Sequence, residues 1–445
     1  MSRVKVSGVP DTLEPLKNKT IRELKFNILY IDLNSCFATT EQQARPKLRN
    51  KPVAVVNRIA EHATIIAASI EAKELGIKVG MRIEEAKNIY NKLILVETEP
   101  SKYIFVHNKL KSIMKSYSPK IVMKSIDEGL IDLSEADNSV KDMTPYNLAI
   151  EIKARLNKEI GSYMKCNIGF SYNRFLAKMA GELHKPNGAD AITYDNIREV
   201  FSHLKLTDLP GINKKTEKRL KTYNIDTPVK LLDASEETLR KQVLKSKEGT
   251  KWYFRLRGAE VDERDDITKS IGRQFVLPPK CSLDNIKIRL AHLAEDVGYR
   301  LRVQELYAYG MYVWVGVNMN ENHFGLHKNI LKKDAFSTDQ EIIEISSKLF
   351  NEIINELKKN NQSLNIRIMG ITLYNLSLSS GQQITLTYEQ DERRRKIADA
   401  VDKINQRFGQ RTVHSAYTLG TEDMRVKIPF GSTRYLAEGS SDDMV

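Results

Sequence analysis

The sequence contains little cysteine and no long apolar run, and each absence excludes a class of protein. Among its 445 residues only three are cysteines, Cys36, Cys166 and Cys281, and they lie far apart without a CxxC pair. Zinc sites and disulfide frameworks need paired cysteines, so we expect neither and predict a reducing compartment. No apolar run approaches the ~18–20 residues of a membrane span, and the first 25 residues lack the apolar core of a signal peptide. The sequence therefore predicts a cytoplasmic location and no membrane partner.

The chain also lacks an internal repeat, a GxxxxGK[ST] phosphate loop and the HExxH pattern of zinc hydrolases. Positive charge is what it has in excess: 70 lysines and arginines against 57 aspartates and glutamates give a formal net charge of +13. Such a chain suits a polyanionic partner, most simply nucleic acid, although charge can also serve solubility alone. The length predicts two to four domains with ample hydrophobic core.

Two adjacent carboxylates, Asp127 and Glu128, stand at a glycine break between two short β-prone runs, 121–123 and 130–133. This pattern predicts a strand, a tight turn and a second strand, with the acids at the junction. Because neighbouring strand residues point to opposite faces, one acid projects from the sheet and the other has to reach around from the turn. Adjacent acids held close indicate a cation, and oxygen ligands suit Mg²⁺, but a solvated hairpin tip is the commoner alternative.

A further carboxylate, Asp32, ends an apolar strand at 26–32, and a helical run follows at 38–43. Alone, Asp32 would be a turn or helix-capping residue. Together with the acid pair it completes the ligand set of a two-Mg²⁺ phosphoryl-transfer site, in which acids from separate strands hold two ions about 3.5–4 Å apart.

The runs 30–38 and 125–128 resemble the two metal-binding motifs of the Y-family (translesion) DNA polymerases, and the UmuC-like bacterial branch, the ImpB/MucB/SamB family, is the most similar. Further matching motifs follow in order, from about residue 26 to about residue 386. The resemblance implies an α+β multidomain fold, a right-hand polymerase with palm, fingers and helical thumb plus a C-terminal α/β little-finger domain. It also implies a template-directed enzyme of low fidelity and processivity that adds dNTPs to a primer 3′-end in DNA damage tolerance.

The resemblance also divides the chain. In order, the segments are a polar N-terminal extension of unknown role (1–22), palm (23–35 and 100–192), fingers (36–99), thumb with a helix-hairpin-helix (193–258), a charged linker (259–268), little finger (269–378), and a clamp-binding-like segment with a tail (379–445). The fingers interrupt the palm, so Asp32 and Asp127 must meet although they are distant in sequence.

By this resemblance Asp32, Asp127 and Glu128 are the catalytic carboxylates and hold two Mg²⁺ ions, with the Leu33 carbonyl as an extra ligand. The primer 3′-hydroxyl would attack the α-phosphate of a dNTP, and pyrophosphate would leave. The main alternative is a catalytically inert, polymerase-like DNA-binding scaffold at stalled forks, against which the intact carboxylate set argues. A nucleotidyl cyclase is a second alternative, but it would not explain the DNA-binding segments that follow.

Four residues are expected at the nucleotide. Phe37 resembles the family's steric gate, a ring that clashes with a ribose 2′-hydroxyl. We expect Cys36 beside it to be a small buried residue and not a nucleophile. The family usually has Tyr and Arg three apart at the triphosphate. This chain has Ile70 and Lys73 there, so Lys73 supplies charge without the fork of Arg, or is a solvated helix charge. Lys185 precedes a Pro-Asn-Gly turn and matches the family's triphosphate-binding lysine.

Two regions are expected to contact DNA. The run 209–220 resembles a helix-hairpin-helix, whose Pro-Gly turn offers backbone N–H groups to a phosphate, although a plain helix start is the alternative. In the little finger the sequence predicts a four-stranded sheet with two helices, 282–303 and 338–358, on one face. The other face is then uncovered and able to follow a phosphate backbone. The expected contacts are Gly211, Asn213, Lys214 and Lys215 in the first region and Lys269 and Arg273 on the uncovered face.

A short segment near the C-terminus resembles the peptide by which bacterial polymerases bind the sliding clamp. Gln383 and Leu386 match its Gln-x-x-Leu pattern, but the usual terminal aromatic is missing. The alternative is a plain linker before a helix at 391–408. The expected partners are therefore primer-template DNA, dNTP and a sliding clamp.

Overall fold

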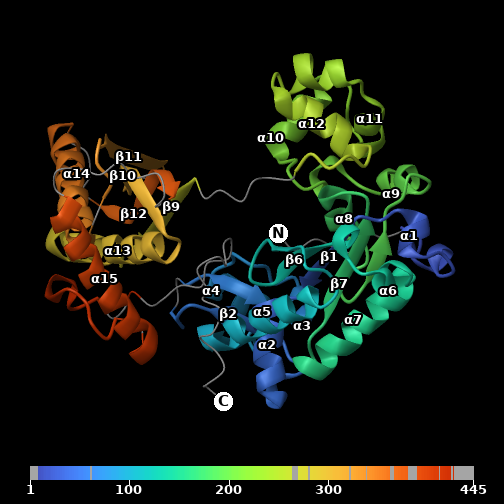
Figure 1. Cartoon of the computed structure of the whole chain (residues 1–445), viewed down its shortest axis with the longest axis horizontal. Coiled ribbons are helices and arrows are strands. Elements are labelled where there is room, and N and C mark those ends of the chain that lie inside the picture. Colours follow the sequence, from blue (N-terminus) through green and yellow to red (C-terminus); the bar gives the residue numbers. More distant parts are fainter. Residues whose placement is uncertain are drawn as a thin grey trace. The chain divides into compact units, whose positions relative to one another are not determined.

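A computed structural model describes residues 9–60, 63–262, 269–278, 281–319, 322–336, 338–360, 365–378, 388–409, 411–421 and 424. The chain divides into two compact units, one with the described residues up to 262 and one with those from 269 (Figure 1). In this described part no helix is long and apolar enough to cross a membrane.

The first unit is built on a five-stranded sheet with the order β5-β6-β1-β7-β8. Its strands are β1 (Ile28–Leu33), β5 (Ile121–Met123), β6 (Glu128–Asp132), β7 (Cys166–Ser171) and β8 (Ala189–Ala191). The central β1 is antiparallel to both β6 and β7, whereas β7 and β8 are parallel. The acid-bearing segments 26–33 and 121–133 are thus neighbours in one sheet, as the sequence predicts.

Alternation along β1 sends its side chains to two different layers. Leu29, Ile31 and Leu33 join the core under α5 (Pro100–Lys115) and α7 (Pro145–Glu159), which lies along the sheet in Figure 1. Ile28 and Tyr30 pack on the opposite face against α8 (Arg174–Ala180). Because strand side chains repeat every two residues, Asp32 leaves the sheet on the α8 face.

A smaller lobe is inserted between β1 and β6. After α2 (Cys36–Ala44) come the strands β2 (Val53–Val56), β3 (Ile65–Ala68) and β4 (Ile94–Glu97), which form a sheet in the order β3-β2-β4. It has a core of its own with α3 (Ile70–Glu74) and α4 (Ile83–Ile89). Ser69 caps α3 by accepting the Ala72 N–H, which fixes where this helix starts and so where Lys73 lies.

The remainder of the first unit is helical, with its own apolar core. It contains α9 (Ile197–Ser202), α10 (Lys214–Lys221), α11 (Pro228–Asp233), a π-helical turn (Thr238–Val243) and α12 (Lys247–Leu256), while α6 (Asn138–Lys141) belongs to the sheet layer.

The N-terminal extension is not the polar appendage that its composition suggested. Leu13 and Ile21 are buried in the core beneath the five-stranded sheet, and Val9 is buried in the core of the helical part. A short helix, α1 (Ile21–Leu24), begins at Thr20 with a capping box that includes Glu23. Apolar side chains at scattered positions fix this segment, and such spacing shows no periodic pattern in the sequence.

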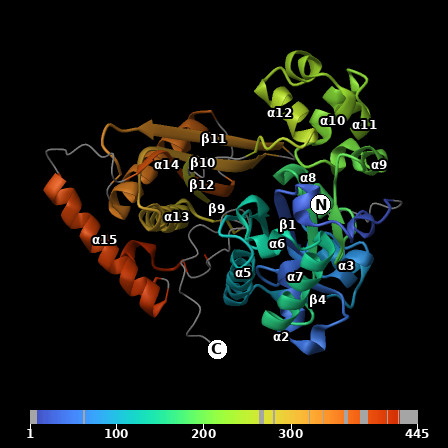
Figure 2. The ribbon, with the colours of Figure 1, turned by 45° about the vertical axis from the view of Figure 1, so that its right-hand side comes forward.

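The second unit is a four-stranded antiparallel sheet in the order β11-β10-β12-β9. Its elements are β9 (Ser270–Val276), α13 (Leu283–Val303), β10 (Leu306–Met319), β11 (Asn322–Leu331), α14 (Asp339–Lys359), β12 (Ile366–Leu378) and α15 (Tyr388–Phe408). Helices α13 and α14 lie side by side and share one core with the sheet, as predicted (Figure 2). The predicted start of α14 is also confirmed, because the Thr338 side chain accepts the Glu341 N–H.

Candidate active site

The two acidic motifs meet on adjacent strands. Asp32 in β1 is paired in register with Glu128 in β6, so both side chains leave the sheet on the same face. The Leu33 N–H donates to the Asp127 carbonyl at 2.9 Å, which holds the turn before β6 against the end of β1. The structure therefore brings together Asp32, Leu33, Asp127 and Glu128.

Glu128 is oriented by two residues that the sequence did not single out. The Tyr30 hydroxyl donates to its carboxylate, and Lys178 in α8 donates to the same oxygen at 2.7 Å. Burial alone would raise the pKa of Glu128, but the charge of Lys178 and these hydrogen bonds outweigh it and lower the pKa. Tyr30 had a signal in the sequence, since it precedes Asp32 by two residues and so shares its face of β1. Lys178 had none.

Asp32 carries the largest perturbation among the site acids. Burial raises its pKa to about 7, with repulsion from Asp127 adding to the rise and the Lys185 ammonium opposing it. Lys185 donates to the Asp32 carboxylate and also to Glu182, at 2.9 Å. The pKa of Asp127 is raised as well, by burial and by repulsion from Glu128, although the Ser125 hydroxyl donates to it at 2.5 Å.

These carboxylates fit a hard divalent cation. Mg²⁺ prefers oxygen donors, and the Asp32 and Glu128 carboxylates come from separate strands. Burial, with repulsion from a neighbouring acid, raises the pKa values of Asp32 and Asp127, so a cation bound there would favour their charged forms. Within the described ranges no three His, Cys, Asp or Glu side chains are already gathered as a metal-binding group. In this structure ammonium groups, those of Lys185 and Lys178, hold two of the acids.

Lys73 points into this site, although it stands in the separate smaller lobe. Its ammonium donates to the Ser35 hydroxyl at 2.7 Å. Desolvation lowers the pKa of Lys73, and the neighbouring Lys185 ammonium lowers it further, while Asp32 and Asp127 act in the opposite direction. Lys73 is an exposed residue, so the structure leaves both readings open: a cation for a triphosphate, and a solvated helix charge.

The turn that carries Lys185 is anchored by Asn34, for which the sequence predicted no role. The Asn34 side chain accepts the Asn187 N–H at 2.7 Å and donates to Asn167 in β7 at 2.8 Å. Asn34 therefore ties the end of β1 to the turn after α8.

Phe37 and Cys36 begin α2 directly after the β1 turn. The Phe37 ring is 4% exposed and stacks on Tyr103, with centroids 4.1 Å apart and planes 6° apart. Cys36 is buried, and burial raises the pKa of its thiol well above the ordinary value, so it stays protonated, as expected of a small buried residue. The Phe37 ring belongs to the core cluster, and its position at the start of α2, shortly after Asp32, is compatible with both a core residue and a gate.

The Pro-Gly turn before α10 has the local geometry expected of a turn whose N–H groups bind a DNA phosphate. Gly211 has φ +94°, which favours glycine, and the Asn213 side chain caps α10 by accepting the Thr216 N–H at 2.9 Å. Lys214 and Lys215 follow at exposed positions at the start of the helix.

One expected DNA contact lies on the wrong face. Arg273 forms an ion pair with Asp296 of α13, on the side of β9 where Ile271 and Phe275 meet the helices. The expectation that Arg273 lies on the uncovered face is wrong, because alternate residues of a strand share a face. Lys269 precedes β9 at an exposed position.

The uncovered face of this sheet is aromatic and uncharged. On this face β10 presents Gly310, Tyr312, Trp314 and Gly316. The residues paired with them in β11 and β12, and the β9 residues paired in turn with β12, include no Lys, Arg, Asp or Glu. Trp314 lies over Gly370, where an added Cβ would approach its ring nitrogen to 2.4 Å. Tyr374 lies over Gly310 in the same way, so these rings lie flat on the sheet.

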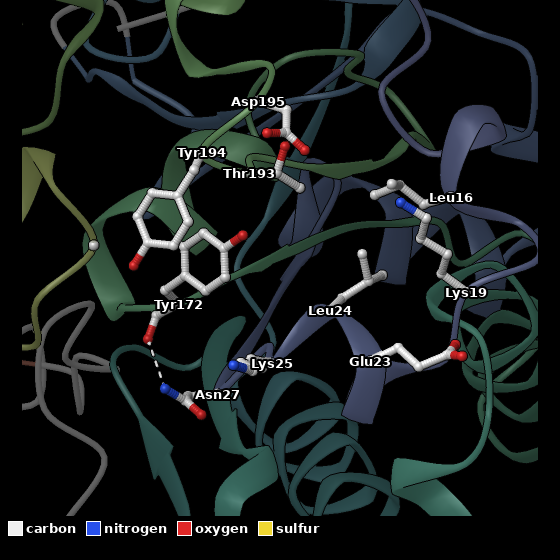
Figure 3. A pocket seen from close by; sticks show the side chains of 11 residues that line it. Leu16, Lys19, Glu23, Leu24, Lys25, Asn27, Tyr172, Thr193, Tyr194 and Asp195 are labelled. Carbon is white, nitrogen blue, oxygen red and sulfur yellow. Dashed lines mark hydrogen bonds between the residues drawn. The ribbon is translucent and has the colours of Figure 1, made fainter.

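A cavity of about 680 Å³ lies away from the carboxylates, between the N-terminal segment and the residues after β7 (Figure 3). Tyr172 and Tyr194 stack there with ring centroids 4.0 Å apart, and the Asn27 side chain donates to the Tyr172 carbonyl. None of the expected site residues that the structure describes lines this cavity. The remaining predicted residues, Gln383 and Leu386, lie outside the described residues.

Three family models match parts of this chain. The model of the impB/mucB/samB family matches residues 31–182, that of the IMS family HHH motif matches 194–225, and that of the impB/mucB/samB family C-terminal domain matches 268–386. These three matches contain both acidic motifs, the turn before α10 and the second sheet.

Several curated relatives carry the name DNA polymerase IV. The one from Pelotomaculum thermopropionicum is 29% identical over 404 residues, covering 88% of this chain and 95% of that protein. The one from Saccharolobus solfataricus is 30% identical over 281 residues, covering 62% of this chain and 78% of that protein. The narrower UmuC-like placement stays a prediction.

A solved structure, that of the Y-family DNA polymerase chimera Dbh-Dpo4(243-245)-Dbh, covers 79% of this chain and 99% of its own, with a TM-score of 0.67 and 21% identity. This likeness confirms the expected fold, a right-hand polymerase with palm, fingers and thumb plus a little-finger domain. The chain belongs to the impB/mucB/samB family, and thereby to the Y-family of translesion DNA polymerases.

Proposed function

We propose that this DNA-directed DNA polymerase extends a primer on template DNA through the carboxylates Asp32, Asp127 and Glu128. One observation carries the proposal: Asp32 and Glu128 face each other across β1 and β6, and Asp127 is hydrogen-bonded through its backbone to the end of β1. Nothing favours the inert scaffold, since all three acids are present and oriented.

The carboxylates and the Leu33 carbonyl would hold two Mg²⁺ ions, which when bound lower the pKa of the attacking primer hydroxyl and neutralise the triphosphate. Lys73 and Lys185 are the cations that the chain offers to the triphosphate, because both lie beside Asp32. Phe37 would close the sugar side, with Cys36 as its small neighbour.

We keep the domain boundaries that the sequence predicted, and the observed sheets support them. We assign the palm to the five-stranded sheet (23–35 and 100–192), the fingers to the lobe with β2–β4 (36–99), the thumb to α9–α12 (193–258) and the little finger to the second sheet (269–378). Among the buried residues at 9–22, Leu13 and Ile21 then belong to the palm core and Val9 to the core of the helical part.

DNA would be held mainly by its phosphates. Gly211, Asn213, Lys214 and Lys215 surround one helix start and suit a backbone grip, and Lys269 adds charge at the edge of the little finger. Arg273 is left out of the DNA contacts, because it pairs with Asp296 on the helix side of β9. The flat aromatic face suits close packing against DNA more than charge attraction.

The segment with Gln383 and Leu386 is proposed to bind a sliding clamp, on its sequence pattern alone. Deleting residues 383–386 should lower clamp-stimulated synthesis and leave basal synthesis unchanged. An equal loss of both would overturn this assignment.

Primer extension with Mg²⁺ and dNTPs tests the main proposal. We expect Asp127→Asn to lower single-nucleotide incorporation by roughly 10²–10³-fold or more, because charge stabilisation of the transition state is lost. DNA affinity, measured separately, should stay unchanged. Asp137→Asn is the matched control, since Asp137 is an exposed acid before α6. Equal activity of the two variants would reject the proposal, and passage of the wild-type enzyme beyond an abasic template site would establish bypass.

A further inference from the structure

The loop between α8 and β8 presents Lys185, and residues 9–13 at the N-terminus, here called the N-terminal strap, contact that loop. The His184 ring mediates the contact: its Nδ1 lies 2.7 Å from an Asp190 carboxylate oxygen and its Nε2 lies 3.0 Å from the Val9 carbonyl oxygen. Both partners can only accept hydrogen bonds, so both ring nitrogens must carry protons. His184 is therefore an imidazolium in this arrangement.

Asp190 needs this cation. Its side chain is almost fully buried, and one carboxylate oxygen accepts from both His184 and the Thr12 hydroxyl, the latter at 2.8 Å. The Thr12 oxygen in turn accepts the Ala191 N–H at 2.9 Å. A buried carboxylate without such partners is costly, so the strap, His184 and Asp190 are coupled. The hydrogen bond to Asp190 raises the pKa of His184 to about 9.

The same loop is also hydrogen-bonded on the side away from the strap, and these contacts restrict its backbone. Lys153 donates to the Asn187 carbonyl at 2.6 Å and to the Gly188 carbonyl at 3.0 Å. An added Cβ on Gly188 would lie 2.3 Å from the His184 carbonyl oxygen, so the loop closes tightly on itself. Where the backbone of His184 is held, Lys185 is held with it.

We propose that the N-terminal strap and His184 are positioning elements that hold Lys185 in place for the nucleotide triphosphate. The inference rests on the proposed role of Lys185. In this proposal the N-terminal strap affects nucleotide affinity and has no role in DNA binding. Its link to the Lys185 loop runs through Thr12 and the Val9 carbonyl.

The test is single-nucleotide incorporation by the full chain, with KM for dNTP, kcat and DNA affinity measured separately. We expect His184→Gln and Thr12→Val each to raise KM for dNTP, His184→Gln by roughly tenfold because a charge-assisted hydrogen bond is removed. DNA affinity should not change. His203→Gln is the matched control, since His203 is exposed at the end of α9.

Two comparisons separate positioning from a general loss of stability. In a Lys185→Ala background, His184→Gln should raise KM no further, because it acts through Lys185. Wild-type KM should rise as pH passes about 9, and that rise should be smaller in His184→Gln, where loss of charge from Lys73, whose pKa is lowered, still contributes. If Lys185→Ala raises KM but His184→Gln and Thr12→Val do not, the strap inference fails alone. If Lys185→Ala leaves KM unchanged, the proposed role of Lys185 fails with it.

Discussion

Among the three site acids, Glu128 differs from Asp32 and Asp127 in the direction of its pKa shift. Lys178 and Tyr30 lower the pKa of Glu128, while burial raises the pKa values of both aspartates, with repulsion from Asp127 adding at Asp32 and repulsion from Glu128 adding at Asp127. Asp32 and Glu128 each accept from an ammonium, but burial outweighs Lys185 at Asp32, whereas Lys178 and Tyr30 together outweigh burial at Glu128. Chemically similar side chains on neighbouring strands thus have pKa values shifted in opposite directions.

Phe37 allows a test at the level of one side chain. We expect Phe37→Leu to raise rNTP incorporation relative to dNTP by roughly tenfold or more, because a smaller side chain leaves room for the 2′-hydroxyl. Leucine is chosen because truncation of this buried ring to alanine would cost about 3–5 kcal/mol of stability. The measurement is the ratio of kcat/KM for the two nucleotides.

Phe105→Leu is the control for this substitution, since Phe105 is an exposed ring in the same α5 that carries Tyr103. An unchanged nucleotide ratio in Phe37→Leu would leave Phe37 as a core aromatic only.

At the scale of elements, strand alternation decides which residues act together. In β1 it sends Leu29, Ile31 and Leu33 to the core and Tyr30 and Asp32 to α8. In β9 the same rule turns Arg273 toward α13 and leaves the opposite face to uncharged residues.

The start of α10 gives the second prediction. Replacing Lys214 and Lys215 together with glutamine should weaken DNA binding about equally for all sequences and reduce the salt slope by about one for each phosphate that the variant no longer neutralises. The reason is that lysines bound to phosphates release counterions without reading bases. Binding titrations over a range of salt concentrations measure both quantities.

The matched double control is Lys230→Gln with Lys241→Gln, because these exposed lysines of the same helical region already pair with Asp226 and Glu237. If the salt dependence of DNA affinity falls equally in both double variants, the effect is one of general charge, and α10 does not contact the phosphates specifically.

At the scale of the whole molecule, the N-terminal segment joins the cores of the palm and of the helical part, through Leu13 and Val9. The ion pair between His184 and Asp190, which this segment contacts, should make stability depend on pH. His184 has a raised pKa, with Asp190 as its partner and Asp11 nearby, so its contribution is fully present below about 6.5 and is lost as pH rises through about 9.

We therefore expect the Tm difference between wild type and His184→Gln to be largest near neutral or lower pH and to vanish above pH about 9. Thermal unfolding across this pH range measures it, with His203→Gln as the control. A difference that is constant with pH would show that His184 packs without its charge contributing.

Local patterns were enough to predict the family, the order of the elements and the three acids that meet at the end of β1, because a strand-end acid, an acid pair at a turn and a helix-capping residue can each be recognised in a short run of sequence. The tertiary structure alone decided that Lys178 and Tyr30 orient Glu128, that Asn34 anchors the Lys185 turn, and that Arg273 faces a helix. These depend on strand register and on helices that pack from distant parts of the chain. Register is set by long-range hydrogen bonds and core packing, and a shift of one residue would reverse every face.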